Sequence, residues 1–211
     1  MEIIYRGAES IIYLDDFEGQ RVVVKERIKK SYRIKQIDEK LRKLRTRKEA
    51  KLLTEARKCN VATPKILDVD EKNHKIIMEF IDGMRIKEFL ENYSEKDIKD
   101  IKTIFVEIGK SIGKLHSNKI IHGDITTSNM ILRDSKIYFI DFGLGEFSNR
   151  IEDMAVDLNL LYEALRATHY KILDFAWQFI IKGYKEEYKD AEKVLKQMEE
   201  IEKRARYMER S

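Results

Sequence analysis

Cysteine, proline and long apolar segments are scarce in this chain of 211 residues. The one cysteine, Cys59, cannot form an internal disulfide and has no zinc-ligand pattern near it, so we expect a structural thiol. No apolar run approaches the ~20 residues that span a bilayer, and the N-terminus lacks signal-peptide character. These absences disfavour a disulfide scaffold and a membrane protein, and they predict a soluble cytoplasmic protein.

Two short motifs carry the strongest chemical signal. The first is HGDITTSN, from His122 to Asn129, and the second is DFG, from Asp141 to Gly143. Asp124 and Asn129 fit the kinase catalytic-loop spacing H-x-D-x-x-x-x-N, and Asp141 opens the D-F-G motif. Phosphoryl transfer needs oxygen ligands for magnesium and a separate carboxylate beside the attacking hydroxyl or water. The spacing predicts Asn129 and Asp141 as magnesium ligands and Asp124 as the catalytic acid-base residue.

The segment between the motifs predicts a β-hairpin. Residues 130–132 and 136–140 have strand composition and flank the turn Arg133-Asp134-Ser135. The hairpin would bring Asn129 and Asp141 together. Either motif alone would be weak evidence, but both in this order around a hairpin predict a bilobal, protein-kinase-like α+β fold.

A lysine ends an upstream strand. Residues 11–14 and 21–25 are predicted strands around a turn at 15–20, and the β-branched run from 22 to 24 favours a strand. Lys25 stands where kinases place the lysine that holds the α- and β-phosphates. We therefore assign Lys25 to ATP binding.

That lysine needs a carboxylate to orient it, which kinases take from the following helix. Residues 34–59 are highly charged and carry apolar residues at helical spacing. Glu49 precedes two leucines by three and four positions, so it projects from the inward face. The spacing favours Glu49 as the partner of Lys25, with Glu55 and Glu39 as competing choices.

A glycine-rich phosphate loop is missing, because no G-x-G-x-x-G occurs near the first predicted strands. One glycine, Gly7, lies between the apolar segments 3–5 and 11–13. Backbone N–H groups of this turn could approach phosphate, since glycine has no Cβ. Gly7, Ala8 and Glu9 are therefore candidate nucleotide contacts.

The boundary between the predicted lobes follows a strand at residues 76–81. Met78 would lie at the back of the adenine pocket, and the hinge backbone would hydrogen-bond the base, so Met78, Glu79 and Ile81 are candidate adenine contacts. A chain of this length can form two closely packed lobes. We predict a strand-rich lobe over residues 1–81 and a helical lobe over residues 82–211.

An ordinary activation segment is also missing, because no A-P-E motif follows D-F-G before Val156-Asp157-Leu158. Kinases use that segment for phosphorylation control and for docking peptide substrates, so a general signalling kinase is disfavoured. Asp157 is predicted to begin a buried helix and to brace the catalytic loop. Gly123 agrees, because many kinases have there an arginine that pairs with a phosphorylated activation segment.

The sequence resembles the small atypical serine/threonine kinase subunit of the KEOPS complex, which supports threonylcarbamoyladenosine formation on tRNA in archaea and eukaryotes. The similarity covers nearly the whole chain. RIO-type kinases are the nearest relatives to exclude, and the run GDITTSN fits them less well. The matching stretches are Gly7-Ala8-Glu9, Val24-Lys25-Glu26-Arg27, Tyr32-Arg33, Arg45-Thr46, Glu49-Ala50, Thr63-Pro64, His122 to Asn129, Asp141 to Leu144, Glu152-Asp153 and Val156-Asp157-Leu158.

The resemblance implies an ATP-binding protein with serine/threonine kinase-like chemistry, whose work in the complex is ATP hydrolysis or switching. Its implied cofactors are ATP and Mg²⁺. Its implied partners are a KEOPS-type tRNA-modifying catalytic subunit and a small helical subunit, with tRNA bound through the complex. By position, Lys25 and Glu49 hold ATP, Asp124 is the acid-base residue, and Asn129 and Asp141 bind magnesium.

Basic charge is concentrated between residues 21 and 58, which contain 16 Lys and Arg against 5 Asp and Glu. Such residues usually form solvated helix faces, but as a patch they would attract tRNA phosphates or an acidic partner. A charged helix is predicted over residues 184–211, and the resemblance gives its basic end, 203–206, a role in tRNA handling. The patch comprises Lys29, Lys30, Arg33, Lys35, Arg42, Lys43, Arg45, Arg47 and Lys48.

Several function classes stay open. In a RIO-like or stand-alone protein kinase, Asp124 activates a serine or threonine hydroxyl. In an ATPase module, water replaces the hydroxyl and hydrolysis drives a tRNA-modifying assembly, which the missing docking segment favours. A small-molecule kinase of the aminoglycoside group shares the HGD pattern but needs a larger lobe for its substrate. A binding-only pseudokinase would lack Lys25, Asp124 or Asp141, and all three are present.

Overall fold

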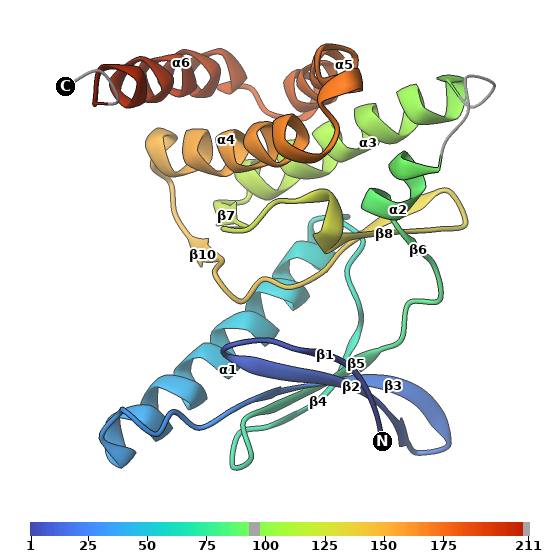
Figure 1. The fold of residues 1–211 in the computed structure, drawn as a ribbon, viewed down its shortest axis with the longest axis vertical. Coiled ribbons are helices and arrows are strands. Elements are labelled where there is room, and N and C mark those ends of the chain that lie inside the picture. Colours follow the sequence, from blue (N-terminus) through green and yellow to red (C-terminus); the bar gives the residue numbers. More distant parts are fainter. Residues whose placement is uncertain (93–97, 209–211) are drawn as a thin grey trace.

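An antiparallel sheet with one long helix forms the first part of the chain, and a mainly helical region forms the rest (Figure 1). The computed structural model describes residues 1–92 and 98–208. Within these ranges the fold is mixed α+β, which confirms the predicted class. No helix in the described ranges has the length and apolar character needed to cross a membrane.

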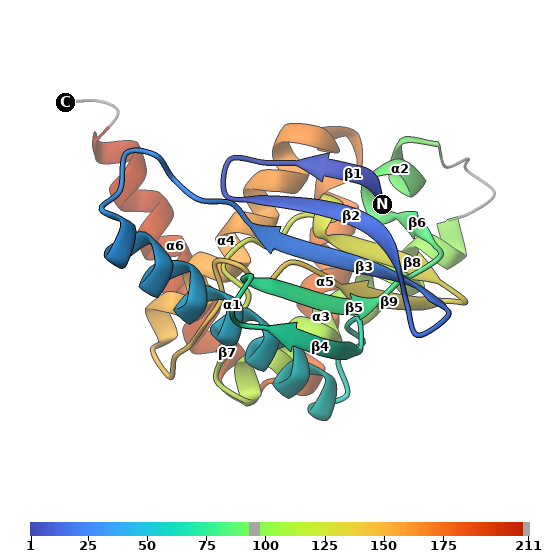
Figure 2. The same cartoon turned by 90° about the horizontal axis from the view of Figure 1, so that it is seen from below.

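The sheet has the strand order β1-β2-β3-β5-β4, and every neighbouring pair is antiparallel (Figure 2). Its strands are β1 (Glu2–Arg6), β2 (Ser10–Phe17), β3 (Gln20–Arg27), β4 (Ile66–Asp70) and β5 (Lys75–Glu79). The predicted turn at 15–20 is too long, because Asp15 and Asp16 pair with β3. The turn shrinks to Glu18 and Gly19, whose φ angles of 54° and 77° suit a two-residue hairpin.

Helix α1 (Lys35–Lys58) packs against β4, β5 and the later strand β10 (Glu146–Phe147). Its second half is buried through Leu52, Leu53 and Ala56. The apolar residues Ile37 and Leu44 of its first half are instead about half exposed, because this half extends beyond the edge of the sheet (Figures 1 and 2). Helical spacing therefore identified the helix, while only its later turns face the core.

The helical region follows β5. In chain order it contains β6 (Met84–Arg85), α2 (Ile86–Glu91), α3 (Ile98–Ser117), β7 (Ile120–Ile121), η2 (Thr127–Asn129), β8 (Met130–Arg133), β9 (Lys136–Phe139), β10 (Glu146–Phe147), α4 (Ile151–Thr168), η3 (Tyr170–Ile172), α5 (Leu173–Glu187) and α6 (Ala191–Met208). β8 and β9 form the predicted hairpin, and its turn residues Asp134 and Ser135 have φ angles of 49° and 61°. β6 pairs with β8, and β10 pairs with β7.

Helices α3 and α5 approach closely because two glycines lie at their contact. A Cβ on Gly109 would lie 1.9 Å from the Ile180 oxygen, and one on Gly183 would lie 2.0 Å from the Val106 oxygen. The main hydrophobic core surrounds this contact. It includes the apolar stripe of α3, namely Ile101, Phe105, Ile108, Ile112 and Leu115.

The prediction of a single helix over residues 184–211 is wrong. Helix α5 ends at Glu187, and α6 begins at Ala191. Between them Tyr188 has extended backbone angles, φ −124° and ψ 112°, and its ring is buried beside His116 and Tyr184. The predicted basic end lies on α6, while residues 209–211 and the side chains after Arg204 lie outside the described part of the chain.

Candidate active site

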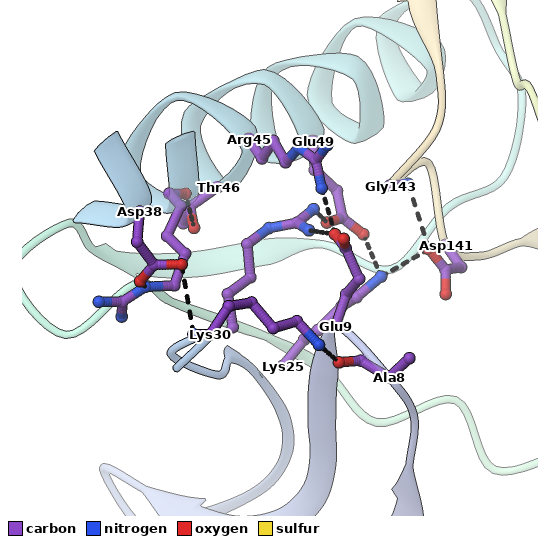
Figure 3. Close-up of polar contacts among 12 residues, drawn as sticks. Ala8, Glu9, Lys25, Lys30, Asp38, Arg45, Thr46, Glu49, Asp141 and Gly143 are labelled. Atoms are coloured by element: carbon purple, nitrogen blue, oxygen red, sulfur yellow. Dashed lines mark hydrogen bonds and ion pairs between the residues drawn. The ribbon is translucent and has the colours of Figure 1, made fainter. Parts of the chain in front are cut away.

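Lys25, Glu49 and Asp141 meet at one point, although they come from β3, α1 and the segment after β9 (Figure 3). The Lys25 Nζ lies 2.6 Å from Glu49 Oε1 and 2.5 Å from Asp141 Oδ1. The competing Glu55 pairs with Lys58 on the surface instead. The contact predicted between Lys25 and Glu49 is therefore present, and its role toward ATP stays a prediction.

Opposite charges set the protonation states of this cluster. Burial disfavours the charged form of Lys25, but Glu49 and Asp141 outweigh burial and raise its pKa. Burial also opposes ionisation of Asp141, and Lys25 with the Gly143 N–H outweighs it and lowers the pKa of this carboxyl. Lys25 and Asp141 are therefore both charged at neutral pH. The Asp141 side chain is 37% exposed, so it is accessible to a ligand.

Asp124 and Asn129 are joined directly. The Asn129 Nδ2 donates to the backbone oxygen and to Oδ2 of Asp124, each at 2.9 Å. The backbone oxygen of Asn129 accepts from the Ile140 N–H at 3.0 Å, so the hairpin brings this loop beside Asp141, as predicted. Asp141 has a φ angle of 62°, a conformation uncommon outside glycine that concentrates at functional sites.

A buried aspartate on α4 holds the predicted catalytic loop, residues 122–129. Asp157 accepts the backbone N–H groups of His122 and Gly123, both at 2.8 Å, and its Oδ2 lies 3.2 Å from His116 Nε2. The predicted brace is present, although α4 begins earlier than Asp157. Gly123 has a φ of 80°, and a Cβ there would lie 2.5 Å from the Leu144 oxygen, so an arginine at this position would be strained.

The free energy of unfolding is expected to fall as the pH is lowered from about 7.5 to about 5.5. Burial lowers the pKa of His122, His74 and His169 below their ordinary value of 6.5. As the pH falls through this range, the unfolded chain binds more protons than the folded chain. Each histidine therefore lowers the free energy of unfolding by up to about 1.4 kcal/mol per pH unit. Urea denaturation at several pH values measures the slope. His122→Gln should flatten the slope, and an unchanged slope would contradict this account.

A cavity of about 340 Å³ connects the lysine cluster with Asp124 and Asn129. Met78, Glu79 and Ile81, the predicted adenine contacts, line one part of it. Mainly apolar side chains line much of the rest, which suits a flat base. The further lining residues are Ile4, Tyr5, Ile12, Val23, Leu53, Pro64, Phe80, Arg85, Ser128 and Ile140.

The turn between β1 and β2 does not contribute to the lining of this cavity. Gly7, Ala8 and Glu9 are not among the described residues that line the cavity. The Ala8 oxygen accepts from the Lys30 ammonium, and the Glu9 carboxylate accepts from the Arg45 guanidinium. The turn is thus fastened to α1 and to the segment before it, and contact of these three residues with a nucleotide stays a prediction.

The predicted basic patch is partly neutralised by ion pairs. Arg33 and Arg45 pair with Glu9, Arg42 pairs with Asp38, and Lys43 and Arg47 pair with Glu71. Two of the three carboxylates, Glu9 and Glu71, come from outside the basic segment, so counting charges within it overstates the local field. Attraction of tRNA to this surface stays a prediction.

Arg27, to which the sequence motifs assign no role, binds the other oxygen of Glu49. Its Nη2 lies 2.5 Å from Glu49 Oε2, and the residue is 5% exposed. The available signal was its spacing, because residues two apart on a strand point to the same face. Arg27 therefore lies beside Lys25 in the structure.

Comparison with family models places most of the cavity-forming chain in a known domain. Residues 13–144 match the model of the RIO domain. The chain thus shares its domain with RIO-type kinases. The GDITTSN run had been interpreted as evidence against such kinases.

Curated relatives extend the similarity over the whole chain. The chain is 48% identical over 221 residues to KEOPS complex subunit Bud32 of Pyrococcus abyssi, and the match covers 100% of this chain and 98% of that protein. It is 44% identical to a probable bifunctional tRNA threonylcarbamoyladenosine biosynthesis protein of Methanosarcina mazei, covering 98% of this chain and 36% of that protein. A protein of the same name from Methanobrevibacter smithii is 43% identical, with 97% and 36% covered. The chain thus spans about a third of the length of these two bifunctional relatives.

Proposed function

We propose that this chain, which belongs to the RIO-domain family and within it to the group of the KEOPS subunit Bud32, hydrolyses magnesium-bound ATP in support of threonylcarbamoyladenosine modification of tRNA. Membership gives a kinase or ATPase type of enzyme that binds ATP with a divalent metal. One observation carries the finer proposal. The Lys25–Glu49 pair, Asp124, Asn129 and Asp141 all line one cavity.

The residues at this cavity fit a nucleoside triphosphate and magnesium. Lys25 brings a charged ammonium group for phosphate oxygens. Asp141 and Asn129 offer carboxylate and amide oxygens, the hard ligands that magnesium prefers, and magnesium needs only a few from protein. Met78 and Val23 supply apolar surface for the base.

Each side chain has a proposed part in the reaction. Lys25 holds phosphate oxygens, and Glu49 keeps the ammonium group in place. Asn129 and Asp141 hold magnesium, which supplies neutralisation of phosphate charge when bound. Asp124, fixed by the Asn129 amide, accepts the proton of the attacking hydroxyl or water at its carboxylate.

The segment after D-F-G favours water as the acceptor. Helix α4 begins at Ile151, and the connection over residues 144–150 includes β10, which pairs with β7. This connection leaves little chain for docking a peptide, so we propose ATP hydrolysis as the main reaction. The second candidate is transfer to a serine or threonine hydroxyl, as in a RIO-like protein kinase, because Asp124 could serve either acceptor.

We also propose that the chain works in a KEOPS-type assembly with a tRNA-modifying catalytic subunit and a small helical subunit, and that tRNA is bound through the assembly. The names of the relatives support the assembly and its work on tRNA, and the small helical subunit is proposed from the family resemblance alone. The proposed functional division is a nucleotide-binding lobe over residues 1–81 and a lobe with the catalytic loop, the magnesium ligands and the basic tail over residues 82–211.

ATP turnover by the full chain, alone and with the tRNA-modifying partner and tRNA, tests the proposed function. Released phosphate and phosphoprotein are measured separately. We expect magnesium-dependent release of phosphate to exceed protein phosphorylation and to rise with partner and tRNA. Phosphoprotein as the main product would favour the kinase alternative, and no consumption of ATP in any mixture would contradict both.

A further inference from the structure

Arg27 and Lys25 lie on the same strand and both form ion pairs with the buried carboxylate of Glu49. Both belong to β3, where residues two apart share a face. Lys25 Nζ lies 2.6 Å from Glu49 Oε1, and Arg27 Nη2 lies 2.5 Å from Glu49 Oε2. Glu49 is 1% exposed, so these two cations replace water around it. Each oxygen of the carboxylate thus has its own cation.

The guanidinium group of Arg27 also reaches toward the β1–β2 turn. Its Nη1 lies 3.9 Å from Glu9 Oε2. Glu9 in turn accepts from Arg45 on α1 (Figure 3). Burial opposes ionisation of Glu9, but Arg45, with Arg33 and Arg27, lowers its pKa below the ordinary value. A continuous chain of charges therefore runs from the β1–β2 turn through Arg27 to Glu49 and Lys25.

Arg27 also lies beside the backbone of the D-F-G motif. A Cβ on Gly143 would stand 3.4 Å from Lys25 Nζ and 3.6 Å from Arg27 Nη2. The two cations therefore border the same short segment that carries Asp141. The Arg27 Nε is buried and has no hydrogen-bond partner among the described residues, a cost that is consistent with this placement serving more than stability.

The charges explain why a second cation is useful here. Lys25 now faces two carboxylates, and a lysine that turns toward phosphate weakens its hold on them. A buried carboxylate left without a cation is destabilising, because nothing replaces the water it has lost. Arg27 keeps its own ion pair with Glu49 Oε2, so the carboxylate stays paired and fixed when the lysine turns toward a ligand.

We propose that Arg27 is a positioning residue of the ATP site. It fixes the Glu49 carboxylate, and Glu49 in turn orients the Lys25 ammonium group toward the phosphates. The inference rests on the proposed ATP chemistry and extends it. Through Glu9, Arg27 also fastens the β1–β2 turn, in a chain that has no glycine-rich loop.

A double-mutant cycle tests this role in the full chain. Arg27→Gln should lower kcat/KM for ATP on the order of 10²-fold, because small displacements of positioning groups have effects of that size. The ATP dissociation constant should rise with it. In a Glu49→Gln background, the same change should cost less than about threefold, because its effect passes through Glu49. Arg27→Lys, which restores a cation, should stay within about tenfold of the parent.

Lys58→Gln is the matched control, because it removes a cation of the same lobe that lies outside the basic patch and whose partner Glu55 lies at the surface. Its kcat/KM should stay within about twofold of the parent. Equal losses from Arg27→Gln in both backgrounds, or no loss in the parent, would overturn the inference. If Arg27→Gln does not fold by circular dichroism, Arg27→Lys decides, and a 10²-fold loss in that variant would overturn it. Failure of the proposed function is distinct, because it would show in the parent itself, either as no consumption of ATP or as phosphoprotein for the main product.

Discussion

Asp124→Ala is expected to reduce ATP turnover by about 10²–10⁴-fold, while ATP binding is largely retained. The loss follows because Asp124 is the carboxylate proposed to accept the proton in the transition state. Binding persists because Lys25 and Asp141, which keep their 2.5 Å contact, do not depend on it. Steady-state phosphate release measures the first effect, and equilibrium titration with ATP and magnesium measures the second.

Asp134→Asn provides the control for this substitution. Asp134 lies in the β8–β9 turn with its side chain 92% exposed, and asparagine tolerates its φ of 49°. Turnover in this variant should stay within about twofold of the parent, as for most surface changes. Normal turnover in Asp124→Ala would remove Asp124 from the catalytic role, and lost ATP binding would show that it acts before the chemical step.

The centre of the site was predictable because short-range spacing carries it. Asn129 and Asp141 flank one hairpin, and a hairpin brings its ends together whatever the rest of the chain does. Lys25 and Glu49 are farther apart, but each sits on a regular element whose periodicity fixes the face it presents. Periodicity therefore predicted the faces, whereas the order of kinase motifs supplied the pairing and left Glu55 and Glu39 as alternatives to Glu49.

The ion pairs around the small sheet were not predictable in this way. Glu9 and Arg45 are 36 residues apart, and Arg47 and Glu71 are 24 apart, in different elements. No periodicity relates these partners, so a count of charges treated Arg45 and Arg47 as unpaired cations. The same limit explains why the contacts of Ala8 with Lys30 and of Glu9 with Arg45 were not predicted, while contact of this turn with a nucleotide stays a prediction.

The ends of elements also depended on tertiary packing. Tyr188 interrupts a charged stretch that local propensity continues as a helix, because burying its ring beside His116 outweighs a few more helical residues. The exposed Ile37 and Leu44 of α1 show the converse, since apolar spacing is present where no core covers it. Pattern identifies an element, and packing decides where it ends and what it buries.

Asp157→Ala is expected to lower the free energy of unfolding by about 3–5 kcal/mol, the range for removing one partner of a buried charged contact. The substitution leaves the N–H groups of His122 and Gly123 unpaired inside the protein, together with Nε2 of His116. Because those amides hold the catalytic loop, turnover should also fall on the order of 10²-fold in the folded fraction. A full urea denaturation curve measures the loss of stability. Phosphate release without urea, at a temperature where the variant is folded, measures the loss of turnover.

Glu163→Gln on the same helix is the control, because its ion pair with Arg166 is solvent-exposed and should change stability by less than about 0.5 kcal/mol. Asp157→Asn separates charge from shape, since it keeps one acceptor oxygen but turns an amide donor toward a backbone donor. It should therefore lie between the parent and Asp157→Ala in stability. A loss under about 1 kcal/mol in Asp157→Ala would mean that the loop amides find other partners, and that the catalytic loop is not held from α4.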